Sequence, residues 1–140
     1  MTHIEQPQLI SLPKIPDDRG NLSFFESGKQ IPFAIKRAYW IYDVPGGEKR
    51  GGHSYHVNRE VIIALSGSFD VVVNDGVNEI KYSLNRSYYG LYVPNRLWRH
   101  LENFSTNSLA LIVASEDFDE ADYERDFERY SQAGKEHAGI

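Results

Sequence analysis

Residues 50–67 read RGGHSYHVNREVIIALSG, and the fold can be predicted outward from this stretch. Its second half, residues 60–65, is a run of aliphatic and β-branched residues that predicts a buried strand. The turn Ser66-Gly67-Ser68 follows, and the next apolar run, residues 69–73, ends at the hairpin signal Asn74-Asp75-Gly76. The stretch and its continuation therefore predict consecutive strands that are joined by tight turns.

The chain on both sides of this stretch has the same pattern of short strands and turns. Further strands are expected at residues 9–15, 22–26, 33–44, 80–84, 89–93 and 109–115. Eight or more short strands with regularly spaced turns are typical of an all-β barrel or a double-sheet jelly roll. In residues 119–132 the aromatic residues Tyr123, Phe127 and Tyr130 recur at four and three residues, which predicts one short C-terminal helix.

Length and composition indicate one ordinary globular domain. The chain has 140 residues, a formal net charge of -5 and no cysteine, so disulfides and thiolate metal sites are excluded. The acidic balance argues against a nucleic-acid partner, and no apolar run is long enough to cross a membrane. We expect a soluble cytoplasmic protein in which residues 1–12 form a tail and first strand, residues 13–132 the domain, and residues 133–140 a disordered tail.

Two segments have the residue spacing of the cupin motifs. His53, Tyr55, Glu60 and Gly67 fall on the spacing of the first motif, and the segment VPNRLWRHLEN (residues 93–103) resembles the second. This resemblance implies an all-β, RmlC-like jelly-roll barrel. Metal-binding cupins offer three histidines and one glutamate, but here Tyr55 and Arg99 stand at two of the histidine positions. A guanidinium has no lone pair and repels a cation, so we expect no metal and no other cofactor.

Longer segments resemble a narrower group within the cupins. DDRGNLSFFE (17–26), IPFAIKRAYWIYDVPGGEKRGGHSYH (31–56), GLYVPNRLWRHLENFS (90–105) and LIVASEDFDEADYERDFERY (111–130) carry this resemblance. Together they resemble the sugar 3,4-ketoisomerases of the WxcM-like, FdtA-type family, across about residues 13–130. The resemblance implies a homodimer that acts on a thymidine-diphosphate-linked (dTDP-linked) 4-keto-6-deoxyhexose. It also implies proton transfer between C3 and C4 of the sugar through an enediol, in deoxy- or amino-sugar biosynthesis.

The candidate catalytic residues are His53, Tyr55 and His56. His53 matches the family pattern R-G-x-H, and an imidazole suits proton transfer near neutral pH. The second histidine of the family falls at Tyr55, whose phenol has a pKa near 10 and is a poor base. Three interpretations stay open: His53 is the base with Tyr55 as acid or orienter, His56 replaces the missing histidine through a strand bulge, or the protein binds without turnover.

Positively charged and aromatic residues are the candidates for binding the nucleotide sugar, because a guanidinium fork matches a phosphate. The substrate-binding candidates are Arg19, Arg37, Tyr39, Arg50, Glu60, Trp98 and Arg99. Arg37 and Tyr39 share one face of the strand expected at residues 33–44, whereas Trp40 and Tyr42 share the other. Trp40 and Tyr42 either stack on the nucleotide base or fill the core, and the interpretation as core residues is preferred.

Two other functions compete with ketoisomerisation. The His53 and Tyr55 pair also resembles the acid-base pair of the dTDP-sugar 3,5-epimerases of the same fold. A non-catalytic cupin that binds a nucleotide sugar is the alternative from a different class, and the loss of the second histidine favours it.

Overall fold

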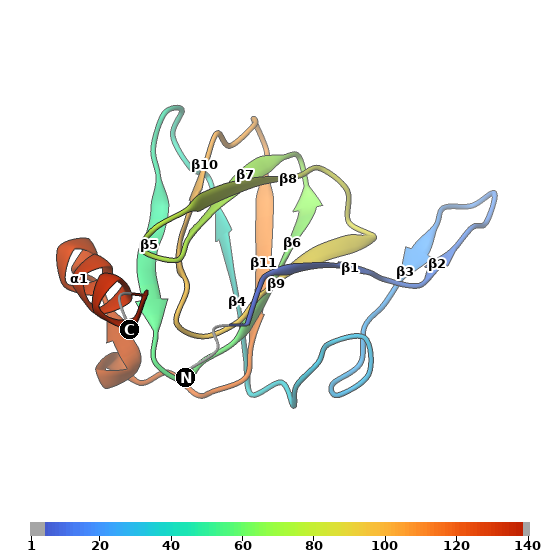
Figure 1. Cartoon of the computed structure of the whole chain (residues 1–140). Helices are drawn as coiled ribbons and strands as arrows, with labels where there is room; N and C mark the ends of the chain where they lie inside the picture. Colours follow the sequence, from blue (N-terminus) through green and yellow to red (C-terminus); the bar gives the residue numbers. More distant parts are fainter. Residues whose placement is uncertain (1–4, 139–140) are drawn as a thin grey trace.

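The computed structural model describes residues 5–138, with side chains through Ala133. Two five-stranded antiparallel sheets make up the body of the molecule, in the orders β1-β9-β6-β11-β4 and β12-β5-β10-β7-β8 (Figure 1). A separate two-stranded hairpin, β2-β3, projects from the body. The strands are β1 Gln8–Ser11, β2 Lys14–Ile15, β3 Leu22–Ser23, β4 Arg37–Tyr42, β5 Arg50–Tyr55, β6 Glu60–Ser66, β7 Phe69–Asn74, β8 Glu79–Leu84, β9 Tyr89–Val93, β10 Trp98–Glu102, β11 Leu109–Ala114 and β12 Tyr123–Glu124.

The apolar core fills the space between the two sheets. Side chains from strands β6 to β11, together with Leu97 just before β10, form it. Its buried members are Ile62, Ala64, Phe69, Val71, Val73, Leu84, Leu91, Val93, Leu97, Leu101, Ala110 and Ile112. Because side chains alternate along a strand, β4 turns Tyr39 and Ile41 toward this core and Trp40 outward. The expected all-β jelly-roll class is confirmed by this two-sheet arrangement.

A second apolar cluster explains why the 60–65 run is apolar at every position after Glu60. Val61 and Ile63 point away from the first core and pack under the N-terminal segment, where Ile31 and Phe33 cover them. Strand β6 is therefore buried on both faces, which requires a continuous rather than an alternating apolar pattern. The N-terminal segment acts as an outer layer over this half of the sheet.

Several sequence-based boundaries were wrong. Strands β5 and β10 were not predicted, and the strand expected at residues 9–15 is divided into β1 and β2. The expected helix at residues 119–132 begins only at Phe127: residues 120–122 form a 3₁₀ turn and Tyr123 lies in β12. The helix α1, Phe127–Ala138, also continues through part of the tail for which disorder was expected. Residues 139–140 lie outside the described residues, and the division into tail, domain and disordered end stays a prediction.

The C-terminal helix is attached to the outer face of β10. Phe127 and Tyr130 pack against the Trp98 ring, with centroids 5.1 and 5.7 Å away. The Tyr130 hydroxyl donates to the backbone carbonyls of Asn74 and Arg96, at 2.9 and 2.7 Å. Within the described residues, no helix has the length and apolar character needed to cross a membrane.

Candidate active site

Strand pairing brings a group of polar and aromatic side chains together at one end of the barrel. On adjacent strands, Arg99 of β10 lies opposite His53 of β5, and Tyr123 of β12 lies opposite Tyr55. On the facing sheet, β11 lies between β4 and β6, the strands that supply Tyr39 and Glu60. Residues far apart in the sequence therefore meet because of register, and all of these side chains share the inner side of the barrel.

Glu60 is the centre of a buried hydrogen-bond network. Its Oε1 accepts from Nε and Nη2 of Arg99, at 3.1 and 2.7 Å, and both side chains are almost fully buried. Its Oε2 accepts from the Tyr55 hydroxyl at 3.2 Å and from the Tyr39 hydroxyl. Four donors thus satisfy the carboxylate, which is the condition for keeping a buried ion pair without a large penalty.

Every nitrogen of the Arg99 guanidinium donates to a protein partner. Besides Glu60, its Nη2 donates to the Tyr39 hydroxyl at 2.9 Å and its Nη1 donates to the carbonyl of Gly51 at 2.8 Å. Burial lowers the pKa of Arg99, but Glu60 together with Tyr39 and Tyr55 outweighs this effect and holds the pKa above its usual value. Arg99 is therefore a fixed internal cation.

A glycine is required at position 51 for two reasons. Its φ of +73° is in the left-handed region, and a Cβ there would lie 2.0 Å from Nη1 of Arg99. The guanidinium can approach the carbonyl of this residue only because no side chain stands in the way.

His53 is held as a neutral imidazole. Burial, followed by the positive charges of Arg99, Arg125 and Arg37, lowers the pKa of His53 to about 2. Its Nε2 is buried and has no hydrogen-bond partner among the described residues, and the same is true of Nε of Arg37. Buried polar atoms of this kind are rare in folded proteins and mark groups that are available to a ligand.

Two tyrosine rings pack against this imidazole and against each other. His53 contacts the Tyr55 and Tyr123 rings at centroid distances of 4.7 and 5.0 Å, and the two tyrosine rings are 4.7 Å apart. All three contacts are edge-on, the geometry that aromatic quadrupoles favour. Burial raises the pKa of Tyr55, and the charge of Glu60 raises it further, so this phenol stays protonated.

The residues present do not fit the metal site of a metal-binding cupin. The guanidinium of Arg99 lies 2.7 Å from Glu60, the one carboxylate of the set, and carries the positive charge itself. Among residues 5–138, no group of three or more His, Cys, Asp or Glu side chains is arranged to hold a metal ion. No step of the chemistry considered below is therefore assigned to a metal.

Comparisons with known proteins identify the family of this chain. Residues 5–135 match the model of the FdtA family, described as WxcM-like, C-terminal. The chain belongs to this family. It is 36% identical over 125 residues to a TDP-4-oxo-6-deoxy-alpha-D-glucose-3,4-oxoisomerase of Aneurinibacillus thermoaerophilus, covering 89% of this chain and 90% of that one.

Solved structures of similar proteins superpose closely on this WxcM-like chain. QdtA, a sugar 3,4-ketoisomerase from Thermoanaerobacterium thermosaccharolyticum solved with TDP, is 34% identical, with a TM-score of 0.90 and coverage of 94% of this chain and 96% of that one. The TDP-quinovose 3,4-ketoisomerase WlaRB of Campylobacter jejuni is 38% identical, with a TM-score of 0.86 and coverage of 92% and 99%. These relatives confirm the sequence-based resemblance to 3,4-ketoisomerases.

Five of the predicted site residues of this WxcM-like protein lie in the cluster: His53, Tyr55, Glu60, Arg99 and Tyr39. Arg37 borders it, because its Nη1 donates to the Tyr123 hydroxyl at 3.4 Å.

The structure does not bring the other four predicted residues into the cluster. His56 is exposed just after β5, where its backbone N–H donates to the carbonyl of Asp122. Trp98 precedes Arg99 in β10, so it points to the opposite face and packs under α1. Arg50 is exposed at the start of β5. Arg19 is 90% exposed in the turn of the projecting β2-β3 hairpin and pairs with Asp17 (Figure 1).

Tyr123 is the site residue that the sequence analysis missed. Its spacing from Phe127 and Tyr130 assigned it to the helix, whereas it lies in β12, opposite Tyr55. The local signal that could have placed it is Asp119, whose side chain accepts from the backbone N–H of Ala121 and caps the 3₁₀ turn before Tyr123. Aspartate favours such local turns over a helix interior.

Proposed function

We propose that this protein is a sugar-nucleotide 3,4-ketoisomerase that moves the keto group of a dTDP-linked 4-keto-6-deoxyhexose from C4 to C3. The observation that carries the proposal is the neutral, buried imidazole of His53, whose Nε2 has no partner among the described residues. The free Nε2 lone pair can accept a proton, and the C3 proton of such a sugar is acidic because a ketone lies beside it. The lowered pKa of His53 makes the imidazole a weak base in the ligand-free protein, so the position of its free nitrogen carries the assignment rather than its basicity. The family match and the named activities of the relatives support the same reaction.

The proposed chemistry is a balanced transfer of protons. His53 removes the proton from C3, the electron pair forms a C3–C4 double bond, and the C4 oxygen gains a proton to give an enediol. The C3 hydroxyl of the enediol then loses its proton to become the new ketone, and C4 gains a proton. No proton is lost or gained overall, and no oxidant is needed.

The state of the phenols assigns the roles within this scheme. Tyr55 and Tyr39 both have pKa values raised by burial and by the Glu60 charge, so both are protonated donors and neither is a base. This favours the interpretation in which His53 is the base and Tyr55 is the acid or orienter. His56, exposed and outside the cluster, has no role in the proposal.

Substrate contact divides among the remaining candidates. Arg37 has a buried, unpartnered Nε beside His53 and is proposed to bind the ligand directly. Glu60 and Arg99 use their polar atoms on each other and on the tyrosines, so we propose that they hold the reacting groups in place rather than bind phosphate.

Solvent isotope exchange tests the reaction. The wild-type protein is incubated with the dTDP-linked 4-keto-6-deoxyhexose in deuterated water, and the product is analysed by NMR. Deuterium at C3 or C4 together with a moved ketone supports isomerisation, whereas deuterium at C5 indicates epimerisation. If the protein binds TDP tightly but exchanges no deuterium into the sugar, it is a binding protein rather than an isomerase, and the proposal is overturned. His53→Asn should abolish exchange, and His56→Asn is the matched control that should leave it unchanged.

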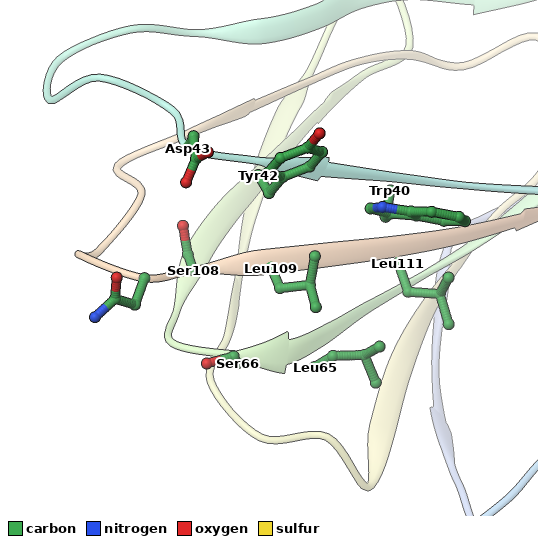
Figure 2. A pocket seen from close by; sticks show the side chains of 9 residues that line it. Trp40, Tyr42, Asp43, Leu65, Ser66, Ser108, Leu109 and Leu111 are labelled. Carbon is green, nitrogen blue, oxygen red and sulfur yellow. The ribbon is translucent and has the colours of Figure 1, made fainter.

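The outer face of the β4-β11-β6 sheet supports a homodimer. Figure 2 shows the side chains of Trp40, Leu65, Leu109 and Leu111 gathered on this face, beside Tyr42. Trp40 and Tyr42 are 59% and 61% exposed, so the interpretation of both as core residues was wrong. The same sheet is already covered by the N-terminal segment over its other half, which leaves this apolar strip as the part without a layer.

We therefore propose that a second copy of the chain covers this strip. Large exposed apolar patches on a soluble protein mark interaction surfaces, and a two-fold dimer needs only one self-complementary patch. Sedimentation or light scattering should give a dimer for the wild type and a monomer for Trp40→Glu. Val77→Glu, at an exposed apolar residue in the turn after β7, is the matched control that should stay dimeric.

A dimer also gives Arg19 a way to reach substrate. The β2-β3 hairpin projects away from its own barrel and carries exposed apolar residues, Ile15 and Leu22, beside the turn that holds Arg19 (Figure 1). We propose that the hairpin lies against the partner subunit, with Arg19 near the partner's nucleotide sugar. Mixing Arg19→Ala subunits with His53→Asn subunits should then restore activity in the mixed dimer. If the mixed dimer regains no activity, Arg19 does not contribute to the partner's site.

A cytoplasmic location and the lack of a nucleic-acid partner stay predictions. They are supported by the absence of cysteine and by the net charge of -5.

A further inference from the structure

Tyr123 lies in the cluster but has no role in the chemistry described so far. It comes from the C-terminal segment, more than sixty positions after His53 and Tyr55, and reaches them because β12 pairs with the end of β5. Its ring contacts the edges of both, at centroid distances of 5.0 and 4.7 Å. The imidazole of His53 is thus enclosed between two tyrosine rings that belong to different parts of the chain.

The segment that carries Tyr123 is fixed immediately before this residue. The Asp122 carboxylate accepts hydrogen bonds from the backbone N–H groups of Val57 and Asn58, at 2.8 and 3.0 Å. The backbone carbonyl of Asp122 accepts one from the backbone N–H of His56, at 3.0 Å. These three bonds attach the C-terminal segment to the connection between β5 and β6. They set the position of Tyr123 relative to the strand that holds His53.

The ring of Tyr123 is also held from other directions. The guanidinium of Arg125 lies 4.3 Å from its centroid and is itself kept in place by two hydrogen bonds to Glu120. Phe118 packs at a centroid distance of 5.8 Å. A ring with this many contacts has little rotational freedom, so it can fix the orientation of the imidazole against which it packs.

The hydroxyl of Tyr123 makes a separate contact. It accepts from Nη1 of Arg37 at 3.4 Å, while Nε of the same guanidinium is buried without a partner in the described part of the chain. The contact therefore holds one end of the guanidinium and leaves another donor available.

We propose that Tyr123 is a positioning residue in two parts: its ring sets the orientation of the His53 imidazole, and its hydroxyl directs the free donor of Arg37 toward the nucleotide sugar. The inference rests on the proposed function, since it assigns His53 and Arg37 to the same reaction. It makes the C-terminal segment part of the active site rather than a covering element.

Two variants separate the ring from the hydroxyl. Tyr123→Leu keeps an apolar side chain but removes the ring, so kcat should fall roughly tenfold to a hundredfold, the loss expected when a reacting group is misplaced by about 1 Å. Tyr123→Phe keeps the ring but removes the hydroxyl that directs Arg37. Its kcat should therefore stay near that of the wild type, while its KM should rise several-fold. This division between kcat and KM would not follow from a general loss of stability.

NMR of the histidine ring gives a readout that does not depend on turnover. The His53 signals, assigned by their loss in His53→Asn, should move in Tyr123→Leu, because the aromatic ring current is gone, and stay nearly in place in Tyr123→Phe. If the wild type binds TDP but does not isomerise the sugar, the proposed function fails, whereas these shifts still test the packing of His53. Tyr130→Phe is the matched control: it weakens the attachment of the same C-terminal segment without contacting His53.

Three results would overturn the inference. An unchanged kcat and unchanged His53 signals in Tyr123→Leu would show that the ring positions nothing. A loss of kcat in Tyr123→Phe as large as in Tyr123→Leu, with His53 undisturbed, would make the hydroxyl a proton donor instead. Equal losses of kcat in Tyr130→Phe and Tyr123→Leu would reduce the effect to loosening of the segment.

Discussion

Replacing Gly51 by alanine tests whether the internal ion pair depends on a gap in the backbone. Gly51 has φ +73°, and an added Cβ would lie 2.0 Å from Nη1 of Arg99. A left-handed conformation costs a non-glycine residue about 1–2 kcal/mol. The guanidinium must also move, and losing its hydrogen bond to the Gly51 carbonyl costs about 1.5–3 kcal/mol, because the donor is charged and buried. We therefore expect Gly51→Ala to lower the free energy of unfolding by about 2.5–5 kcal/mol.

Gly28 offers a matched control for the backbone part of this cost. It has the same φ of +73°, but nothing lies within 4 Å of the position where its Cβ would be. Gly28→Ala should therefore cost only the conformational part, about 1–2 kcal/mol. Both variants are measured by urea unfolding at one protein concentration, because the stability of a dimer depends on concentration.

The difference between the two variants isolates the effect on Arg99. If Gly51→Ala and Gly28→Ala lose the same stability, the Arg99 contact contributes nothing and the reasoning fails. Activity gives a second measurement, since displaced Arg99 also disturbs Glu60 and the tyrosines that bond to it. Gly51→Ala should therefore lose turnover at temperatures where it remains folded, and Gly28→Ala should not.

Three further predictions follow from the same cluster. The pKa of His53 is about 2 in the folded protein and near 6.5 in the unfolded chain, so between these pH values the unfolded state binds more protons. The free energy of unfolding should therefore fall by up to about 1.4 kcal/mol per pH unit as the pH drops below 6.5. Urea titrations at several pH values should show this decrease in the wild type, and His53→Asn should lack it. Arg99→Met leaves the Glu60 carboxylate buried and unpaired, so it should cost about 3–5 kcal/mol, and the double variant with Glu60→Gln should recover part of that loss. Tyr55→Phe keeps the ring against His53 but removes the donor to Glu60; turnover should fall while TDP affinity, measured by calorimetry, stays near wild type.

The sequence predicts a strand well where burial dictates an apolar pattern. Strand β9 was predicted with its observed bounds, and β6 and β7 nearly so, because each has a dense run of branched or aromatic residues. Strand β5 contains RGGHSY, whose glycines and polar residues have low strand propensity, and it was missed. Its glycine at position 51 and its histidine serve the site rather than the core. Local propensity fails there because the neighbouring strands and the ion pair hold it.

Alternation also shows what could have been predicted about faces and what could not. The pairing of Arg37 with Tyr39, and of Trp40 with Tyr42, follows from the period of a strand and is correct in β4. Which of the two pairs faces inward depends on the opposite sheet and cannot be read from the strand alone. Trp40 is exposed in the structure, so placing it in the core was wrong. The same period excludes a shared face for neighbours in one strand, so Trp98 could already have been separated from Arg99.

The replacement of two expected histidines by Tyr55 and Arg99 is one coupled change rather than two losses. Arg99 provides a permanent cation beside one oxygen of Glu60, and the second carboxyl oxygen needs donors of its own. Phenols that stay protonated meet that need, and Tyr55 and Tyr39 both donate to Oε2. A neutral imidazole at position 55 could donate only in one tautomer, and its protonation would place a second cation beside Arg99. His53 is then left as the buried imidazole of the cluster with an unpartnered ring nitrogen, which is why the proposed reaction depends on it.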